Sequence, residues 1–365
     1  MVSEVVGTGG RILKEIKQKV QINSVQWEHT LRYGIDGMFM SRVAHVSGTQ
    51  TSEKASDFLK IGTDGKSGTF TFPAEENTVA VYSIKTFRNP HFTYYGKLPR
   101  LSLVGDETSA LFFLGLETGG KSGNAIFSFR LIKTSTYDNL LTVSVGGQFS
   151  STNPSMDIYK PSDFDTADHR YGVKVARNLA MLLVDGTIIF FAIPTGAYPP
   201  TTIKYNVKPY GIAFIPCISP SLSLLMEYTT NRSTTAPSDV TFDFNPTRLC
   251  CQEGSDIIPL TLPLYIENSD TKLAGYSISS GSVTSHEVPI FGYTKKTLYF
   301  HADQSGTLEI EIYTTTKNWR TYDTQSVSAN TLLSYNIDAE GILARVIFTP
   351  STYPCTVNEA EIILC

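Results

Sequence analysis

The sequence predicts an all-β protein with two β-sandwich, jelly-roll-like domains in series. Most segments alternate apolar and polar residues, or form short apolar runs that end at turn residues. Only 18% of the residues are charged, whereas 20 Phe and 19 Tyr supply aromatic side chains that suit pleated, half-buried strands. A length of 365 residues exceeds the usual size of one domain and suffices for two hydrophobic cores.

The predicted strands lie along both halves of the chain. In the first half they are Thr69 to Phe72, Thr78 to Ile84, Ala110 to Leu116, Ala125 to Ile132, Leu140 to Gly146, Gly172 to Val175 and Met181 to Val184. In the second half they are Thr297 to Ala302, Gly306 to Thr314, Leu343 to Phe348 and Glu359 to Leu364. Turn residues separate these runs, and Asp185-Gly186 carries residue types that accept the positive φ values of a tight hairpin turn.

Proline placement indicates where the two domains meet. The stretch from Tyr198 to Pro220 holds five prolines, which are poor strand residues, so we expect domains at 1–210 and 211–365. The segment from Thr229 to Pro237 is polar and predicts an exposed loop, which contains the sequon Asn231-Arg232-Ser233. Near the N-terminus, the i, i+4 spacing of Ile12, Ile16 and Val20 allows one short helix.

Charge and hydropathy argue against two classes of partner. A net charge of −4 without a stripe of Lys and Arg argues against nucleic acid. No uninterrupted apolar run approaches the roughly 20 residues that span a bilayer. The first ten residues lack a basic region followed by an apolar one, so we expect no signal peptide.

The five cysteines leave two states open. They are Cys217, Cys250, Cys251, Cys355 and Cys365, and an odd number excludes complete internal pairing. Free thiols and one or two disulfides both fit this count, whereas no histidine lies near enough in sequence to predict a zinc site. The adjacent pair Cys250-Cys251 points to opposite faces if it lies in a strand.

One segment carries a family resemblance. His169-Arg170-Tyr171 opens a predicted strand, and Val184-Asp185-Gly186 forms the turn of the following hairpin. Over about residues 110–195 this pattern resembles the concanavalin A-like and laminin-G-like jelly-roll domains. The resemblance implies a lectin-like sandwich at this position and raises the question of glycan binding.

The search for catalytic motifs gives no positive result. Glucanases of the concanavalin-like class carry an E-x-D-x-x-E strand that sets two carboxylates on one face, and this chain has no such string. Glu309 and Glu311 share a strand face, but Ile310 and Ile312 predict that this face is the solvated one. Gly-x-Ser-x-Gly and His-Glu-x-x-His are also absent, so we expect no enzyme activity.

Two loops supply candidate site residues. Aromatic rings and planar polar groups gather in a segment of the kind that contacts sugars, with the candidates Arg88, Asn89, His91, Tyr94 and Tyr95. A second loop carries three carboxylates that suit the oxygen preference of Ca²⁺, at Asp163, Asp165 and Asp168. Calcium is the one cofactor we consider, and a solvated turn is the alternative for these aspartates.

The predicted function follows from sandwich modules in series, a neutral composition rich in Ser, Thr and Tyr, and no secretion signal. We expect a structural or attachment protein on the surface of a virion or another extracellular particle. Its partners would be further copies of itself, neighbouring particle proteins or cell-surface glycans. A carbohydrate-binding, lectin-like protein is the alternative, and a glycoside hydrolase is the third option. A pair of carboxylates about 5–9.5 Å apart in a cleft would favour the hydrolase.

Overall fold

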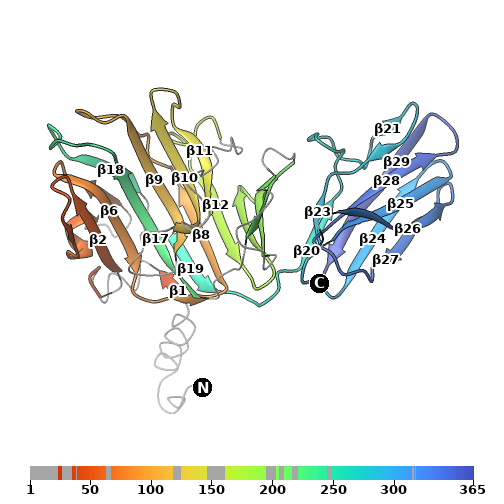
Figure 1. Ribbon diagram of the computed structural model, residues 1–365, viewed down its shortest axis with the longest axis horizontal. Coiled ribbons are helices and arrows are strands. Elements are labelled where there is room, and N and C mark those ends of the chain that lie inside the picture. Colours follow the sequence, from red (N-terminus) through yellow and green to blue (C-terminus); the bar gives the residue numbers. More distant parts are fainter. Residues whose placement is uncertain are drawn as a thin grey trace, which may run out of the picture. The chain divides into compact units, whose positions relative to one another are not determined.

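A computed structural model describes residues 24–26, 35–37, 39–62, 67–117, 125–145, 161–194, 203–204, 209–215, 221–244, 249–314, 316 and 318–365. The chain forms two compact units, shown in Figure 1. Unit 1 comprises residues 1–175, 181–188 and 219–254, and unit 2 comprises residues 176–180, 189–218 and 255–365. No helix in the described part of the chain is long and apolar enough to cross a membrane.

The largest sheet of unit 1 has eight strands, and we call it the main sheet. Its order is β11 (Leu140–Val145), β10 (Ala125–Thr134), β9 (Ser109–Glu117), β17 (Ser221–Thr230), β6 (Glu76–Ser83), β2 (Phe39–His45) and β3 (Gln50–Thr51), with β7 (Phe87–Arg88) paired to β17. Their pairings are antiparallel. Strand β17 lies between β9 and β6, so a distant segment of the sequence forms the centre of the sheet.

Two further sheets of unit 1 complete its core. One contains β1 (Ser24–Gln26), β19 (Leu249–Glu253), β8 (Pro90–Gly96), β12 (His169–Val175) and β13 (Ala180–Val184), and the other contains β18 (Val240–Phe244), β5 (Gly68–Phe72) and β4 (Leu59–Ile61). The single turn of α3 (Ala55–Phe58) precedes β4. The Phe129 ring of β10 meets the Tyr171 ring of β12 edge-on with centroids 5.4 Å apart. The Phe72 ring of β5 lies 4.3 Å from that of Tyr228 of β17. Both smaller sheets therefore pack on one face of the main sheet, which we call its core face.

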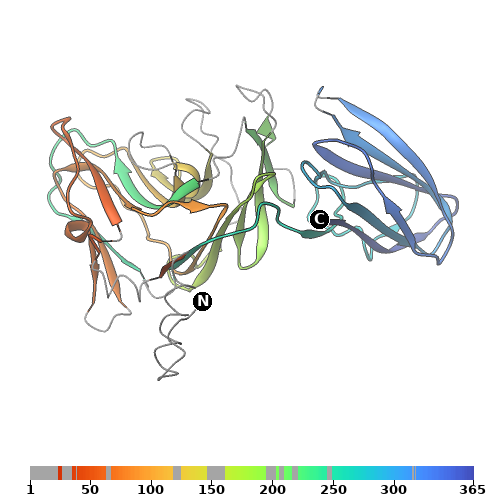
Figure 2. The same ribbon diagram turned by 90° about the horizontal axis from the view of Figure 1, so that it is seen from below.

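Unit 2 contains a sandwich of two five-stranded sheets, coloured from cyan to blue in Figures 1 and 2. One sheet holds β20 (Leu260–Pro263), β29 (Cys355–Leu364), β24 (Lys296–Ala302), β27 (Leu333–Asn336) and β21 (Ser277–Ile278). The other holds β22 (Val283–Thr284), β28 (Leu343–Pro350), β25 (Gly306–Tyr313), β26 (Trp319–Val327) and β23 (Val288–Pro289). Phe300 and Phe348 meet between the sheets with ring centroids 4.8 Å apart. Most of β14 (Thr187–Pro194) and all of β15 (Ile203–Lys204) and β16 (Gly211–Ile215) also belong to unit 2.

The structure confirms the all-β class and the sandwich architecture. Each strand predicted above coincides with an observed strand to within a few residues. Asp185 and Gly186 both have positive φ, at 51° and 82°, as the hairpin turn requires. Ile310 and Ile312 face the core, so Glu309 and Glu311 lie on the outer face of β25 as expected. The predicted N-terminal helix lies outside the described residues, and the boundary at residue 210 stays a prediction.

The burial of Cys250 and Cys251 alternates as expected for neighbouring residues of a strand. Cys251 is buried and Cys250 is half-buried, in keeping with neighbouring positions on opposite faces of β19. The thiols of Cys251, Cys355 and Cys365 are free, whereas Cys217 lies outside the described residues.

A buried histidine in unit 2 gives its stability a predictable pH dependence. The backbone N–H of Tyr265 donates to Nδ1 of His286 at 2.9 Å, so the ring proton resides on Nε2 and donates to the Tyr210 hydroxyl, 2.8 Å away. That hydroxyl donates in turn to the carbonyl of Glu287 at 2.9 Å. Burial lowers the pKa of His286 from 6.5 to about 4. The network is therefore built for neutral imidazole.

Unit 2 should lose stability as the pH falls from 6.5 to 4. In this window the unfolded chain binds a proton at His286 and the folded chain does not. The free energy of unfolding should therefore fall by about 3 kcal/mol between pH 6.5 and pH 4. Urea unfolding at a series of pH values measures the effect. Because other groups also titrate, the comparison is with His286→Gln, whose unfolding free energy should change less over the same range. Equal pH profiles for both proteins would contradict the assignment.

Candidate functional site

The face of the main sheet opposite the core carries a row of charged residues. Strand register places Arg42, Ala80, Glu227, Phe113 and Arg130 side by side across β2, β6, β17, β9 and β10. Residues directly opposite each other in a sheet project to the same side, so all five point away from the core face. We call this the outer face of the main sheet.

The outer face is shielded from solvent at its centre. Ala80, Tyr82, Phe113 and Leu225 form a buried apolar cluster there. Strands β6 and β9 are accordingly buried on both faces along most of their length. The charged groups of the row therefore lie in a less polar environment than a solvated sheet face would provide.

Two carboxylates and one guanidinium meet on this face. Nη2 of Arg42 lies 3.1 Å from Oε2 of Glu227 and 3.8 Å from Oε2 of Glu117, the last residue of β9. The two carboxylate oxygens are thus no more than about 7 Å apart, a limit that includes the separations used by glycosidases. The Glu117 and Glu227 side chains are only 3% and 9% exposed, and Arg42 is 15% exposed.

The environment makes Glu227 a proton donor near neutral pH. Burial raises the pKa of Glu227 to about 7, the Arg42 charge opposes this rise, and the negative charge of Glu117 adds to it. On the same face, burial lowers the pKa of Arg130 to about 10, while its Nε donates to the Thr142 hydroxyl at 2.9 Å. A carboxyl group with a pKa near 7 beside a second carboxyl group is the arrangement of an acid and its partner.

Two polar atoms of the outer face are buried without a hydrogen-bond partner among the described residues. Among the described residues, nothing accepts a hydrogen bond from the buried Nη1 of Arg42, and nothing pairs with the buried hydroxyl of Ser128. A buried donor without a partner costs about 1–3 kcal/mol, which a bound hydroxyl, carboxylate or water can offset. The outer face therefore offers an acid, a second carboxylate and an unsatisfied donor.

The sequence-predicted sugar contacts do not converge. Along β8, Tyr94 is buried against Tyr171 with ring centroids 6.3 Å apart, and its hydroxyl donates to the carbonyl of Lys97. Tyr95 is 38% exposed and projects to the other side of the strand, as does the half-buried His91. Arg88 is exposed on β7, whereas Asn89 is buried with φ of 46°. Tyr94 thus belongs to the core, and sugar binding by the other four stays a prediction.

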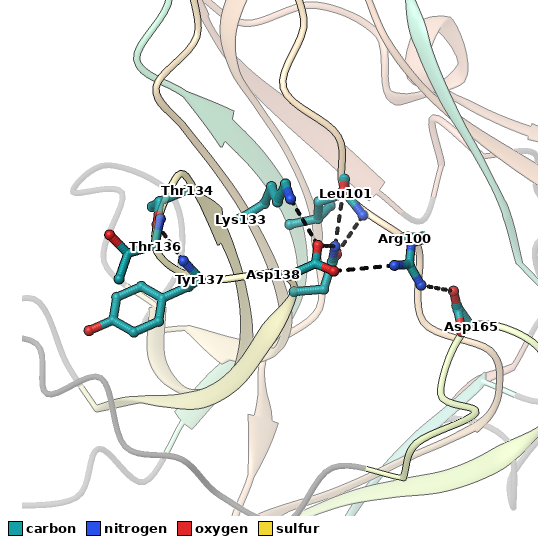
Figure 3. Close-up of polar contacts among 9 residues, drawn as sticks. Arg100, Leu101, Lys133, Thr134, Thr136, Tyr137, Asp138 and Asp165 are labelled. Atoms are coloured by element: carbon teal, nitrogen blue, oxygen red, sulfur yellow. Dashed lines mark hydrogen bonds and ion pairs between the residues drawn. The ribbon is translucent and has the colours of Figure 1, made fainter.

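The three aspartates of the predicted calcium loop take separate partners. The Asp163 carboxylate lies 3.0 Å from Nε2 of His169, and that of Asp165 lies 3.0 Å from Nη1 of Arg100. Figure 3 shows Asp165 directed at Arg100, whose other terminal nitrogen lies 3.3 Å from Asp138. Asp168 immediately precedes β12. Calcium binding at Asp163, Asp165 and Asp168 stays a prediction.

The residues that carry the family resemblance hold a hairpin in place. Nδ1 of His169 lies 2.8 Å from the Asp185 carboxylate, which also accepts the backbone N–H of Arg170 at 2.8 Å. The backbone N–H of Asp185 donates to the carbonyl of Arg170 at 2.8 Å. The turn after β13 is thereby fixed to the start of β12, so the motif has a structural role.

Sequence reasoning missed Arg42, Glu117 and Glu227. The search was for carboxylates within one strand, whereas this pair comes from β9 and β17, which are distant in sequence and adjacent in space. One signal was present: Glu227 interrupts the apolar run Leu224 to Tyr228, where a charged side chain is costly to bury. His45, Glu53 and Glu76 form a separate cluster whose ligand atoms lie close enough together to hold a metal ion.

Comparison with known proteins gives structural matches only. No family model and no curated protein sequence matches this chain. Similar solved structures include the laminarinase from Rhodothermus marinus, with a TM-score of 0.39 and 9% identity over 60% of this chain and 91% of that one. The β-glucanase of Bacillus licheniformis gives 0.35 and 11% over 60% and 92%, and the alginate lyase AlyC3 gives 0.37 and 11% over 62% and 93%.

These matches correct one expectation. The sequence predicted a protein without enzyme activity, but the similar structures are glycoside hydrolases and polysaccharide lyases, and the non-enzyme prediction is not carried further. At 9–11% identity the similarity concerns the fold and transfers neither a substrate nor a catalytic residue. What the structure itself establishes is an all-β chain whose two units are built from packed β-sheets.

Proposed function

We propose that the chain binds a polysaccharide at the outer face of the main sheet and hydrolyses its glycosidic bonds. The observation that carries this proposal is the pair Glu117 and Glu227, held within about 7 Å by one guanidinium, with the pKa of Glu227 raised to about 7. Glycoside hydrolysis needs one protonated and one ionised carboxyl group, and this pair can supply both at neutral pH.

The roles of the three residues follow from their environments. Glu227 donates its proton to the oxygen of the leaving sugar, because its buried carboxyl group retains a proton near pH 7. Glu117 provides the second carboxylate, which attacks the sugar or activates a water. Arg42 positions both carboxylates and presents its unsatisfied Nη1 to a sugar hydroxyl or carboxylate.

A polysaccharide panel with two readouts tests this function. Purified protein is incubated with neutral β-glucans, sulfated galactans, uronate polymers and mucin, and both reducing ends and the near-ultraviolet absorbance of unsaturated sugars are measured. We expect new reducing ends without unsaturated products. Unsaturated products would show that the chain cleaves by elimination, as a lyase does, and not by hydrolysis. Binding without either product would reduce the function to that of a lectin, and neither binding nor product would contradict the proposal.

The location on a particle surface, the self-association and the binding of cell-surface glycans stay predictions. They are compatible with a polysaccharide-acting jelly roll, because a particle that meets a glycan coat can bind it and cut it.

A further inference from the structure

A second cluster of ionisable side chains lies at the edge of the main sheet. His45 ends β2, Glu76 begins β6 and Glu53 follows β3. One potential ligand atom from each lies within 4.8 Å of those of the other two. A register shift between Ala44 and His45 brings His45 opposite Glu76, and such bulges redirect side chains.

Hydrogen-bond accounting fixes the tautomer of His45. The Thr51 hydroxyl has one proton, which it donates to Oε1 of Glu53 at 3.1 Å. Its oxygen can therefore only accept from Nε2 of His45, 2.9 Å away, so this ring nitrogen carries a proton. The other ring nitrogen, Nδ1, faces Oε2 of Glu76 at 2.8 Å.

The contact between Nδ1 and Glu76 needs either a proton or a metal ion shared by the two atoms. Glu76 is 3% exposed, and its Oε2 lies 2.8 Å from Nδ1 of His45. A nitrogen lone pair and a carboxylate oxygen at 2.8 Å repel each other unless positive charge lies between or beside them. In tetrahedral coordination, two ligand atoms about 2.0–2.1 Å from a metal ion lie about 3.3 Å apart, so the 2.8 Å contact would have to widen when an ion enters.

We propose that His45, Glu76 and Glu53 bind a divalent transition metal, with Zn²⁺ the first candidate. One imidazole and two carboxylates are a ligand set that Zn²⁺ accepts. Thr51 orients the ring from the opposite nitrogen, as the outer partners of metal-bound histidines do. The Ser41 hydroxyl donates to the carbonyl of Glu53 at 2.7 Å and fixes its backbone.

The site leaves a coordination position open. His45 also lines an open groove of about 850 Å³, together with Val46, Ser47, Thr49, Glu75 and residues 233–235. Water or a ligand oxygen in this groove can complete the coordination of an ion held by three protein ligands. The groove residues are mainly hydroxyl-bearing, which suits a polar ligand.

Titration calorimetry of the full chain, without a polyhistidine tag and after chelator treatment, tests the proposal with ZnCl₂ alone. We expect one ion bound per chain. His45→Gln and Glu76→Gln should each weaken binding by at least about 100-fold, and Glu53→Gln by about 10-fold, because Glu53 is the most exposed ligand. Glu53→Gln also serves if the buried variants fail to fold.

Two matched variants control for non-specific binding. Glu75→Gln alters the groove but not the cluster, and His169→Gln alters the other described histidine that contacts two carboxylates. Both should bind Zn²⁺ as the unaltered protein does. Absence of binding would show that a proton serves as the cation. Binding unaffected by His45→Gln and Glu76→Gln, or a thiolate charge-transfer band with Co²⁺, would place the ion elsewhere. Each of these results overturns the proposal.

Discussion

Glu227→Gln should lower the turnover of the polysaccharide found in the panel by about 10²–10⁴-fold, which is the usual contribution of a general acid. Glutamine has the shape of the acid but donates no proton to a leaving oxygen. The loss should be much smaller for an aryl glycoside with an acidic phenol, because that leaving group departs without protonation. Glu117→Gln should reduce hydrolysis of both substrates, since the second carboxylate is needed in either case.

The pH profile provides a second readout of the same residue. The pKa of Glu227 is about 7, so its protonated fraction and the activity should fall as the pH rises through 7. In Glu227→Gln this alkaline fall should disappear from the remaining activity.

Glu309→Gln is the matched control, because it changes a glutamate on the solvent side of β25 in unit 2, far along the chain from Glu117 and Glu227. It should leave kcat and KM unchanged. If Glu227→Gln retained full activity on the polysaccharide, the catalytic role of Glu227 would be wrong.

Arg232→Ala should destabilise unit 1 by about 3–5 kcal/mol, because it leaves a buried carboxylate without its charge partner. Nη2 of Arg232 lies 2.6 Å from Oε1 of Glu107, and neither side chain has any exposed surface. Nη1 donates to the carbonyl of Ala74 at 2.7 Å, and the guanidinium lies 4.8 Å from the centre of the Phe72 ring. Urea unfolding monitored by circular dichroism measures the loss.

The double variant Arg232→Met with Glu107→Leu should be more stable than either single variant, because it removes both buried charges. Arg100→Ala is the exposed control. The Arg100 side chain is 61% exposed and pairs with Asp138 and Asp165, so its loss should cost far less stability than the loss of Arg232. Equal effects of Arg232→Ala and Arg100→Ala would contradict this account.

The burial of Arg232 also corrects the sequence-based prediction for its loop. The segment from Thr229 to Pro237 was predicted as an exposed loop, and most of it is exposed, but Arg232 and Ala236 are buried. The sequon residue Asn231 accepts hydrogen bonds from the backbone N–H groups of Thr108 and Ser109 at 3.0 and 2.9 Å. A glycan on this side chain would disturb these contacts.

The local pattern of the sequence determined the strands and their turns. Alternation of period two, as in Leu308, Ile310 and Ile312, specifies which face of a strand is buried, and Asp185-Gly186 specifies a tight turn. Both depend on residues that are neighbours in the chain, so one sequence sufficed to predict them.

Tertiary structure alone decided which side chains meet. Strand β17 inserts between β6 and β9, and this places Glu227 beside Arg42 and Glu117. The same packing buries Glu227, raises its pKa and hides the charges of Arg232 and Glu107. Burial and proximity are properties of the assembled sheets, because the energy of a charge depends on what surrounds it in space. No pattern of neighbouring residues in the chain contains that information.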